Sequence, residues 1–179
     1  MLRQQRMTGQ RGGTLIEVMM VLAILGVIAG FSMPYLQDTM KNWRITSQTN
    51  ELLADFTAAR GQAAAKTMTV TVCASSNGST CTGSWSQGRL VFTDSNADAT
   101  ISTGDELLRY SPTITTGTTL AAANLSTSGR VQFRPTGMAS GVTGSGATFK
   151  FCDDRTGAFG RLVTIAPTGR ASSSTTTCP

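Results

Sequence analysis

Glu17 has the most unusual chemical setting in this sequence. It is the only charged residue between Thr14 and Met33, a segment of 20 residues. At about 1.5 Å per residue a helix of that length spans roughly 30 Å, the thickness of a bilayer's hydrocarbon core. A carboxylate inside such a segment costs a few kcal/mol, so Glu17 predicts a partner of opposite charge.

The residues before this segment predict its orientation. Arg3, Arg6 and Arg11 precede it without any acid, so its N-terminal end is expected to stay in the cytoplasm. A secretory signal peptide is one alternative, but its apolar region is shorter and ends at a small-residue cleavage site. A plain membrane anchor is the other alternative, and it leaves Glu17 unexplained.

The composition argues against an enzyme. The chain has 179 residues and no His, which excludes a His-based triad, a His general base and His metal ligands. No convincing pair of nucleophile and base stands out among the other residues. We therefore expect no catalytic residue and no enzymatic activity.

Four cysteines follow the apolar segment: Cys73, Cys81, Cys152 and Cys178. An even number of cysteines in an oxidising compartment favours disulfides, and three connectivities are possible. We favour Cys73–Cys81, which closes a loop after a strand, together with Cys152–Cys178, which holds the C-terminal tail. A zinc site is the rival interpretation, but the sequence contains no Cys-x-x-Cys pair.

No cofactor is expected, but an acidic loop offers a candidate site for calcium. Asp94, Asn96, Asp98 and Asp105 stand at positions 1, 3, 5 and 12 of a calcium-type loop. Position six is Ala99, where glycine is expected, and the flanking residues form strands. The alternative interpretation is a hairpin turn that uses Asp and Asn for its own hydrogen bonds.

Residues 12–17, Gly-Gly-Thr-Leu-Ile-Glu, resemble the type III signal of type IV prepilins and type II secretion pseudopilins. The resemblance implies that prepilin peptidase cuts between Gly12 and Gly13 and methylates the new amine. Glu17 is then the fifth mature residue, where the family carries a Glu that neutralises the amine of a neighbouring subunit. The sequence departs from the family at Gly13, where Phe is usual.

Gly26 and Pro34 become the fourteenth and twenty-second mature residues, where major pilins commonly carry helix-breaking Gly and Pro. Gly costs about 1 kcal/mol and Pro about 3 kcal/mol in a helix interior. The stretch between them is therefore expected to kink or melt when it is packed in a filament. An ordinary kinked membrane helix is the alternative.

A second helical pattern and then a β-rich region follow. Apolar residues at steps of three or four predict an amphipathic helix to about residue 65: Leu36, Met40, Trp43, Leu53, Phe56 and Ala63. We favour a place in the core for Trp43, and a place near the membrane interface is the alternative. Alternating patterns then predict strands at 68–74, 89–93, 106–110, 130–134, 147–152 and 161–166. Residues 113–128 are expected to form a long loop or a flexible edge of the sheet. Two Pro-Thr-Gly turns, at 135–137 and 167–169, predict similar strand-and-turn units.

This order of elements predicts an α+β fold, with a long N-terminal helix packed on an antiparallel β-sheet head, the lollipop shape of pilins. The expected parts are a cleaved leader (1–12), a transmembrane and filament-core helix (13–40) and a periplasmic head (41–179). The head resembles the GspH/FimT group of minor pilins and pseudopilins at residues 85–94, 130–137 and 160–170.

The resemblance implies a minor pilin of a type IV pilus, incorporated at or near the filament tip, that supports assembly. A GspH-type minor pseudopilin of a type II secretion system is the alternative. The expected partners are prepilin peptidase, the inner membrane before assembly, and other minor and major pilins. The expected location is the inner membrane, crossed once, with a periplasmic head, and afterwards the extracellular pilus.

The distribution of charge bears on nucleic-acid binding. The formal charge of the chain is +5, but three of its Arg residues lie in the expected leader. Residues 107–179 hold seven Lys and Arg against two Asp, so the positive excess lies there. Some FimT-type pilins bind double-stranded DNA through a Gly-Arg-x-Arg signature, of which residues 169–172 keep the first Arg. The expected DNA-contacting residues are Lys150, Arg155, Arg161 and Arg170, with solvated surface arginines as the alternative.

Overall fold

The computed structural model describes residues 12–179, with residues 31–34 described by their backbone alone. These residues form two compact units, with the boundary between Met40 and Lys41. One helix, α1 (Leu15–Lys66), contributes to both units. We call residues 41–179 the head.

The first unit consists of the start of α1. The carbonyl of Thr14 accepts hydrogen bonds from the amides of Glu17 (3.1 Å) and Val18 (3.3 Å), which fixes the beginning of the helix at Leu15. The backbone is helical at both Gly26 and Pro34. The expected kinking or melting of this stretch in a filament stays a prediction.

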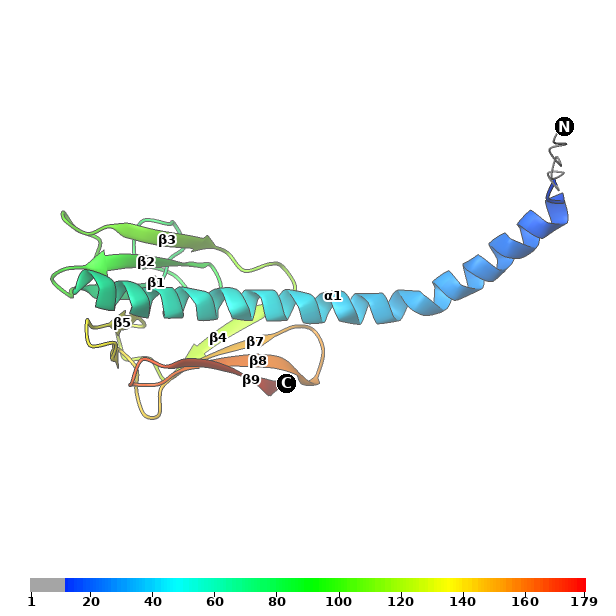
Figure 1. Cartoon of the computed structure of the whole chain (residues 1–179). Coiled ribbons are helices and arrows are strands. Elements are labelled where there is room, and N and C mark those ends of the chain that lie inside the picture. Colours follow the sequence, from blue (N-terminus) through cyan, green and yellow to red (C-terminus); the bar gives the residue numbers. More distant parts are fainter. Residues whose placement is uncertain (1–11) are drawn as a thin grey trace, which may run out of the picture. The chain divides into compact units, whose positions relative to one another are not determined.

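The head contains two antiparallel sheets (Figure 1). The first sheet has the order β3-β2-β1-β5-β6, formed by β1 (Thr69–Ala74), β2 (Gly88–Asp94), β3 (Leu107–Pro112), β5 (Val131–Phe133) and β6 (Ala139–Ser140). The second has the order β4-β7-β8-β9, formed by β4 (Thr119–Ala123), β7 (Ala147–Cys152), β8 (Gly157–Ile165) and β9 (Ala171–Cys178). A long helix followed by antiparallel sheets confirms the predicted α+β class.

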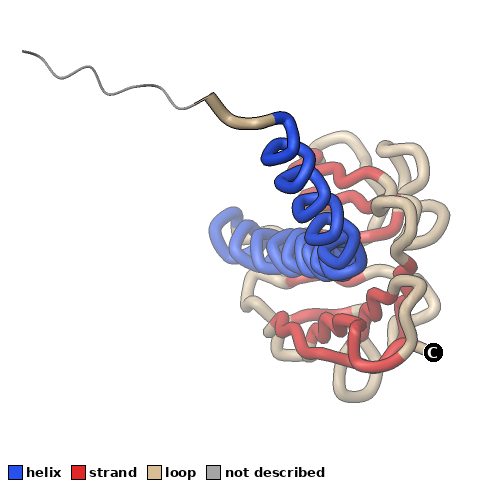
Figure 2. Tube along the Cα trace, turned by 90° about the vertical axis from the view of Figure 1, so that its right-hand side faces the viewer, coloured by secondary structure: helices blue, strands red, loops and turns tan. Residues whose placement is uncertain are grey.

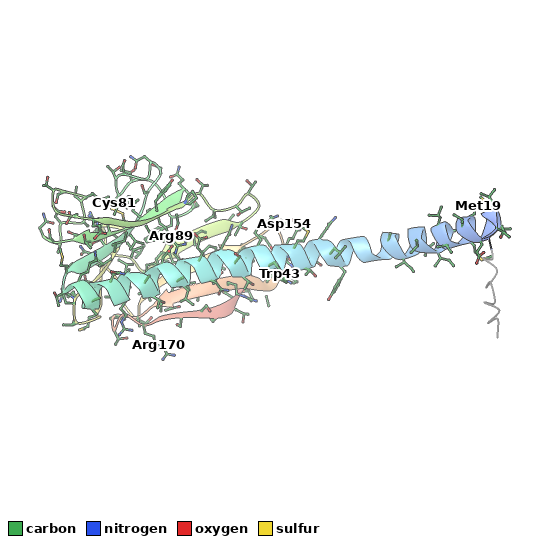
Figure 3. All side chains as sticks on the ribbon, turned by 45° about the horizontal axis from the view of Figure 1, so that its top comes forward. Met19, Trp43, Cys81, Arg89, Asp154 and Arg170 are labelled. Atoms are coloured by element: carbon green, nitrogen blue, oxygen red, sulfur yellow. A yellow bond between two sulfur atoms is a disulfide. The ribbon has the colours of Figure 1, made fainter. Side chains whose placement is uncertain are left out.

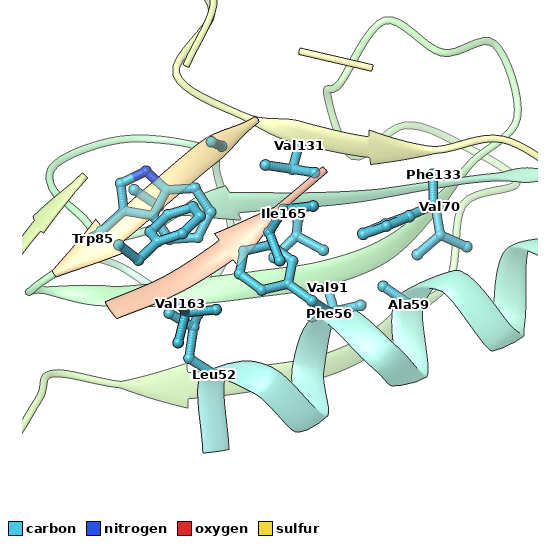
Figure 4. Close-up of a cluster of buried hydrophobic side chains, with 14 of the residues drawn as sticks. Leu52, Phe56, Ala59, Val70, Trp85, Val91, Val131, Phe133, Val163 and Ile165 are labelled. Atoms are coloured by element: carbon cyan, nitrogen blue, oxygen red, sulfur yellow. The ribbon is translucent and has the colours of Figure 1, made fainter. Parts of the chain in front are cut away.

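The core lies where the C-terminal half of α1 meets both sheets (Figures 2 and 4). Phe56 from α1 lies 6.0 Å from Trp85 and 5.1 Å from Phe149 of β7, measured between ring centroids. Phe133 of β5 lies 6.3 Å from Phe56 on the other side. Because one helical side chain contacts aromatic rings from both sheets, α1 holds the sheets together.

The helix face that packs on the head differs in part from the prediction. Phe56 and Ala63 are buried as expected, but Trp43 is 75% exposed, so its predicted place in the core is wrong. Ile45 is buried in its place, and Leu36 and Met40 are also exposed. The apolar periodicity of the sequence continued past the point where the head stops covering the helix.

Three strands were not predicted: the two-residue β6, and the longer β4 and β9. The expected loop at 113–128 contains β4, which pairs with β7 over five residues from Thr119↔Cys152 to Ala123↔Thr148. The expected C-terminal tail is β9, which pairs with β8. Six consecutive Ser and Thr residues of β9, 172–177, give no alternation to read, although Thr favours extended backbone.

A buried ion-pair network joins α1 to the first sheet. Asp55 is fully buried, and its Oδ2 lies 2.5 Å from Nε of Arg89, which is only 2% exposed. The Nε of Arg109 lies 3.0 Å from the other carboxylate oxygen. The hydroxyl of Ser111 donates a hydrogen bond to Oδ2 of Asp55 at 3.1 Å. The network fixes the position of the helix on β2 and β3.

Candidate functional site

The N-terminal end of α1 places a carboxylate beside the expected cleavage point. A Cβ atom added to Gly13 would lie 3.5 Å from Oε2 of Glu17. Glu17 stands in the first helical turn, where the helix dipole favours an anion. Of the expected leader, only Gly12 falls within the described residues, and residues 1–11 lie outside them. This geometry suits a carboxylate that meets a backbone amine.

The following turns of α1 expose apolar side chains on every side. Leu15 is 80% exposed and Val21 is 50% exposed. The same holds for the large apolar residues between and after them: Ile16, Val18, Met19, Met20, Leu22, Ile24, Leu25, Val27 and Ile28. Figure 3 shows such side chains around Met19. A helix that is apolar all round needs an apolar environment, from lipid or from neighbouring helices.

The membrane criterion is met only by a bent arrangement. Among the described residues no single helix is long and apolar enough to cross a bilayer. The pair Leu15–Gly30 and Tyr35–Lys66 passes together by length and composition. The break between them contains Pro34, a residue that the sequence marked as a helix breaker.

The cysteines form two disulfides, with the pairing favoured from the sequence. Cys73 in β1 is bonded to Cys81 in the following loop, and Cys152 at the end of β7 is bonded to Cys178 at the end of β9. The second disulfide joins strands that are separated by β8 in the sheet. It therefore holds the last strand of the chain in place.

The acidic loop between β2 and β3 is a hydrogen-bonded turn. The buried carboxylate of Asp94 accepts hydrogen bonds from the Thr71 hydroxyl (2.6 Å) and the Ala99 amide (2.8 Å). Asp105 accepts from the amides of Ser95 (3.0 Å) and Ser102 (2.9 Å), and these bonds lower its pKa to about 2.

The other two candidate calcium ligands also serve the turn. Asn96 donates to Asp98 at 2.8 Å, and Asp98 accepts from the amide of Thr100 at 2.7 Å. No three Asp, Glu, Cys or His side chains of residues 12–179 form a group that could hold a metal ion. These hydrogen bonds are those that the hairpin-turn interpretation expects, and the calcium interpretation stays a prediction.

The four basic residues expected to contact DNA do not form one surface. Lys150 is opposite Leu162 in the pairing of β7 and β8, whereas Arg161 is opposite Phe151. Since successive residues of a strand point to opposite faces, Lys150 and Arg161 lie on opposite faces of the sheet. Arg170 is exposed in the turn before β9 (Figure 3).

Arg155 is occupied by contacts within the head. Its Nη2 lies 2.7 Å from Oδ2 of Asp153 and donates to Asn42 at 2.9 Å, and its guanidinium lies 4.3 Å from the ring centroid of Phe159. Burial raises the pKa of Asp153, but the hydrogen bonds from Arg155 outweigh this and hold that pKa below its ordinary value. The guanidinium of Arg155 thus has partners on three sides within the head.

Two further arginines, Arg60 and Arg134, were not among the expected residues. Both are exposed, and Arg134 opens the first Pro-Thr-Gly turn. The repeat of that turn before Arg170 was the sequence signal that could have drawn attention to Arg134. No sequence pattern pointed to Arg60, which lies on the helix.

An acid beside the first residue of an uncovered apolar helix, followed by an antiparallel β-rich head, is the arrangement of type IV pilins and pseudopilins. The family comparison refines this class. Residues 48–169 match the family described as type II transport protein GspH, and residues 7–33 match the prokaryotic N-terminal methylation motif. The chain belongs to the GspH family.

Two curated pilins resemble a part of the chain. The type IV major alpha-pilin of Moraxella bovis is 42% identical over 52 residues, which is 29% of this chain. A fimbrial protein of Pseudomonas aeruginosa is 42% identical over 53 residues. This chain covers only about one third of the length of these relatives, 33% and 34%.

Two solved structures share the fold. The type IV minor pilin FimU of Pseudomonas aeruginosa has a TM-score of 0.52 at 20% identity, covering 72% of this chain and 86% of that one. The minor pseudopilin EpsH of the Vibrio cholerae type 2 secretion system has a TM-score of 0.53 at 7% identity, covering 74% and 97%. At these identities the likeness concerns the fold alone.

Proposed function

We propose that this chain is a minor pilin of a type IV pilus, incorporated at or near the filament tip, where it supports assembly. In this proposal prepilin peptidase removes residues 1–12 and methylates the amine of Gly13. The protein then crosses the inner membrane once, with a periplasmic head, before it enters the extracellular filament. Its partners are other minor and major pilins.

The observation that carries the proposal is the carboxylate of Glu17 beside Gly13, at the start of a helix with exposed apolar residues on all sides. A free amine at Gly13 and a carboxylate at Glu17 are both costly in an apolar environment. Pairing the carboxylate of one subunit with the amine of the next lowers both costs and fixes the stagger between subunits. This gives an apolar filament core with a defined register.

The alternative function is a GspH-type minor pseudopilin of a type II secretion system. The family match and the fold are compatible with both systems. The 42% identity with fimbrial proteins, over 52 and 53 residues, supports the pilus. Deletion of the gene separates the two: loss of pili and twitching supports the proposal, whereas loss of exoprotein release with normal pili supports the alternative.

A substitution that removes the charge of Glu17 but keeps the shape of its side chain tests its role. We expect Glu17→Gln to be inserted in the membrane but to be absent from sheared pili, because the amine of its neighbour is left unpaired. Asp38→Asn, which removes another acid of the same helix outside the apolar segment, is the matched control and is expected to enter pili normally. Normal incorporation of Glu17→Gln would contradict the assigned role.

The proposal includes sequence-independent binding of double-stranded DNA by the head during natural transformation. Its support is the excess of basic residues in the C-terminal part of the chain. Uptake of a marker DNA by the deletion strain, compared with the complemented strain, tests it. Equal uptake by the two strains in a competent host would refute this part and leave the assembly role untouched.

A further inference from the structure

A polar cavity lies between α1 and the connection from β3 to β4. It has a volume of about 190 Å³ and is lined by Gln48 and Glu51 of α1, Arg89 of β2 and residues 112–115. We call it the Gln48 cavity. Its lining includes none of the residues expected to be cleaved, to pair with the amine of a neighbour or to contact DNA.

The wall formed by residues 112–115 is fixed to the rest of the head. The amide of Ile114 donates to the carbonyl of Ser86 at 3.1 Å. Directly after the wall, Nη1 of Arg44 in α1 donates to the carbonyl of Thr116 at 3.1 Å. Figure 1 shows this connection passing across the helix on its way to β4. Because both ends of the wall are held, the cavity is preformed, as ligand sites usually are.

The amide group of Gln48 is buried at this cavity. Gln48 is only 8% exposed, and both its Nε2 and its Oε1 are buried without a hydrogen-bond partner among residues 12–179. Nη2 of Arg89 is also buried without a hydrogen bond of good geometry, although it lies 3.1 Å from Oε1 of Glu51. A buried polar group without a partner destabilises the folded protein, and nearly all such groups in proteins are paired. The cavity therefore concentrates unused donors and an unused acceptor.

The ionised groups around the Gln48 cavity balance one another. Arg89 pairs with Glu51 and Asp55, and Arg109 pairs with the same two acids. Two acids thus face two bases, which leaves no net charge to attract an ion. The polar groups of the cavity instead require a neutral ligand that offers a donor and an acceptor together.

The unused atoms discriminate between classes of ligand. A carboxylate would accept from Gln48 and Arg89, but it would leave Oε1 of Gln48 unpaired and would be repelled by Glu51. A cation would pair with Oε1 and Glu51, but it would leave the N–H groups of Gln48 and Arg89 unpaired. A carboxamide carries a carbonyl and an N–H₂ group in one plane, so it can exchange two hydrogen bonds with the amide of Gln48.

We propose that the Gln48 cavity binds a carboxamide group, carried by a small molecule or by an Asn or Gln side chain of a neighbouring subunit. Both sources present the same carbonyl and N–H₂ to Gln48. The second source rests on the proposed function, whereas the first does not. The volume of 190 Å³ is about six times the ~30 Å³ that a water molecule occupies, so a carboxamide with two or three carbons fits. Water alone is the alternative occupant.

Titration of the full chain in non-ionic detergent with acetamide tests the proposal. Two-dimensional ¹H–¹⁵N NMR follows the side-chain amide signal of Gln48, which is assigned by its loss in Gln48→Met. We expect a saturable shift with a Kd on the order of millimolar, because the probe has so few atoms. Acetate has the same shape without the N–H₂ group, and methylammonium is a cation. Each is expected to bind at least tenfold more weakly.

Three variants make the test specific, with the backbone amide signal of residue 51 as the readout. Gln48→Met keeps the length of the side chain and should weaken acetamide binding at least tenfold. Its Tm should equal or exceed that of the wild type, because an unpaired buried amide is removed, whereas a purely structural role predicts a lower Tm. Gln62→Met, at an exposed glutamine of the same helix, is the matched control and should bind acetamide like the wild type. Glu51→Gln disturbs the charge balance and should raise the affinity for acetate at least threefold.

Two results would overturn the proposal: no saturable shift with acetamide, which leaves water as the occupant, or binding of acetate by the wild type as tight as that of acetamide. Pili then distinguish the two sources. Absence of Gln48→Met from sheared pili assigns the carboxamide to a neighbouring subunit, whereas normal incorporation assigns it to a small molecule. Since Glu17→Gln reports on assembly separately, failure of the proposed function leaves the acetamide result unaffected.

Discussion

The buried carboxylate of Asp55 gives the sharpest prediction about stability. Asp55→Asn keeps the shape of the side chain and removes its charge. Arg89, which is 2% exposed, then keeps only Glu51, whose side chain is 41% exposed and lies 3.1 Å away. Removing one partner of a buried ion pair typically costs about 3–5 kcal/mol, because the remaining charge is left uncompensated. We expect a loss of that size.

Urea and thermal unfolding of the full chain in non-ionic detergent, followed by near-UV circular dichroism, measure the loss. Buried Trp85 beside Phe149 provides the signal. A loss of about 3–5 kcal/mol corresponds to a fall in Tm of roughly 6–20 °C for a domain of this size. Arg109→Gln is the control, because its side chain is 49% exposed and such a pair contributes at most about 1 kcal/mol.

A double substitution separates burial of charge from simple packing. Asp55→Leu/Arg89→Met replaces both charges by apolar groups, which is often neutral for a buried pair. It is expected to be clearly more stable than Asp55→Asn. An Asp55→Asn protein within about 1 kcal/mol of the wild type, or a double variant as unstable as the single one, would show that Arg89 is not held by this carboxylate.

Three other features yield predictions. Cys152→Ser/Cys178→Ser opens a loop with a sequence separation of 26, and is expected to cost about 3–4 kcal/mol in urea unfolding and to expose β9 to proteolysis; equal stability would contradict this. The pKa of Asp105 is lowered from 3.8 to about 2, so its ionised form adds stability above pH 3.8 that is lost as the pH falls through 2. Asp105→Asn should flatten the stability profile in that range, and an unchanged profile would assign it to other groups. Gly169→Ala should destabilise the head well beyond Gly144→Ala: both glycines have positive φ, 77° and 58°, but only Gly169 would place its Cβ against a carbonyl oxygen. Equal losses would show that the turns are not in contact.

The elements that were predicted correctly are those with a strong local pattern. Phe56 and Ala63 repeat on one helical face, and the alternating apolar residues at 147–152 define β7. The predicted burial of Trp43 was wrong, because periodicity shows that one face of the helix is apolar but not how much of that face is covered. β4 and β9 were missed because the pairing with β7 and β8 that holds them is not visible in their own residues, and only Leu120, Ala122 and Ala171 of these strands pack on the core.

The acidic loop shows why ligand spacing alone was insufficient. Asp94 and Asp105 have the spacing of a calcium loop, yet each carboxylate accepts hydrogen bonds from nearby amides. These short-range hydrogen bonds require only local turns of the backbone. In this loop the turns place Ala97 and Ala99 at positive φ values of 58° and 60°. A metal site would need the same oxygens turned towards a common centre. Local bonding and shared coordination compete for the same atoms, and the spacing does not decide between them.

The bases of the head that have no ion pair among the described residues could not be identified from charge counted along the chain. Arg60 belongs to the stretch 44–106, in which acids outnumber bases by six to four, so this segment appeared unsuited to an anion. This net charge does not show that Arg89 and Lys66 form ion pairs with acids of the same stretch. Arg60 instead lies against glycines, which carry no carboxylate. What attracts a polyanion is the charge left after internal pairing, and that depends on contacts between elements. The repeated Pro-Thr-Gly turn is the sequence feature that joins Gly137 and Gly169, because a side chain on Gly169 would collide with the carbonyl of Gly137.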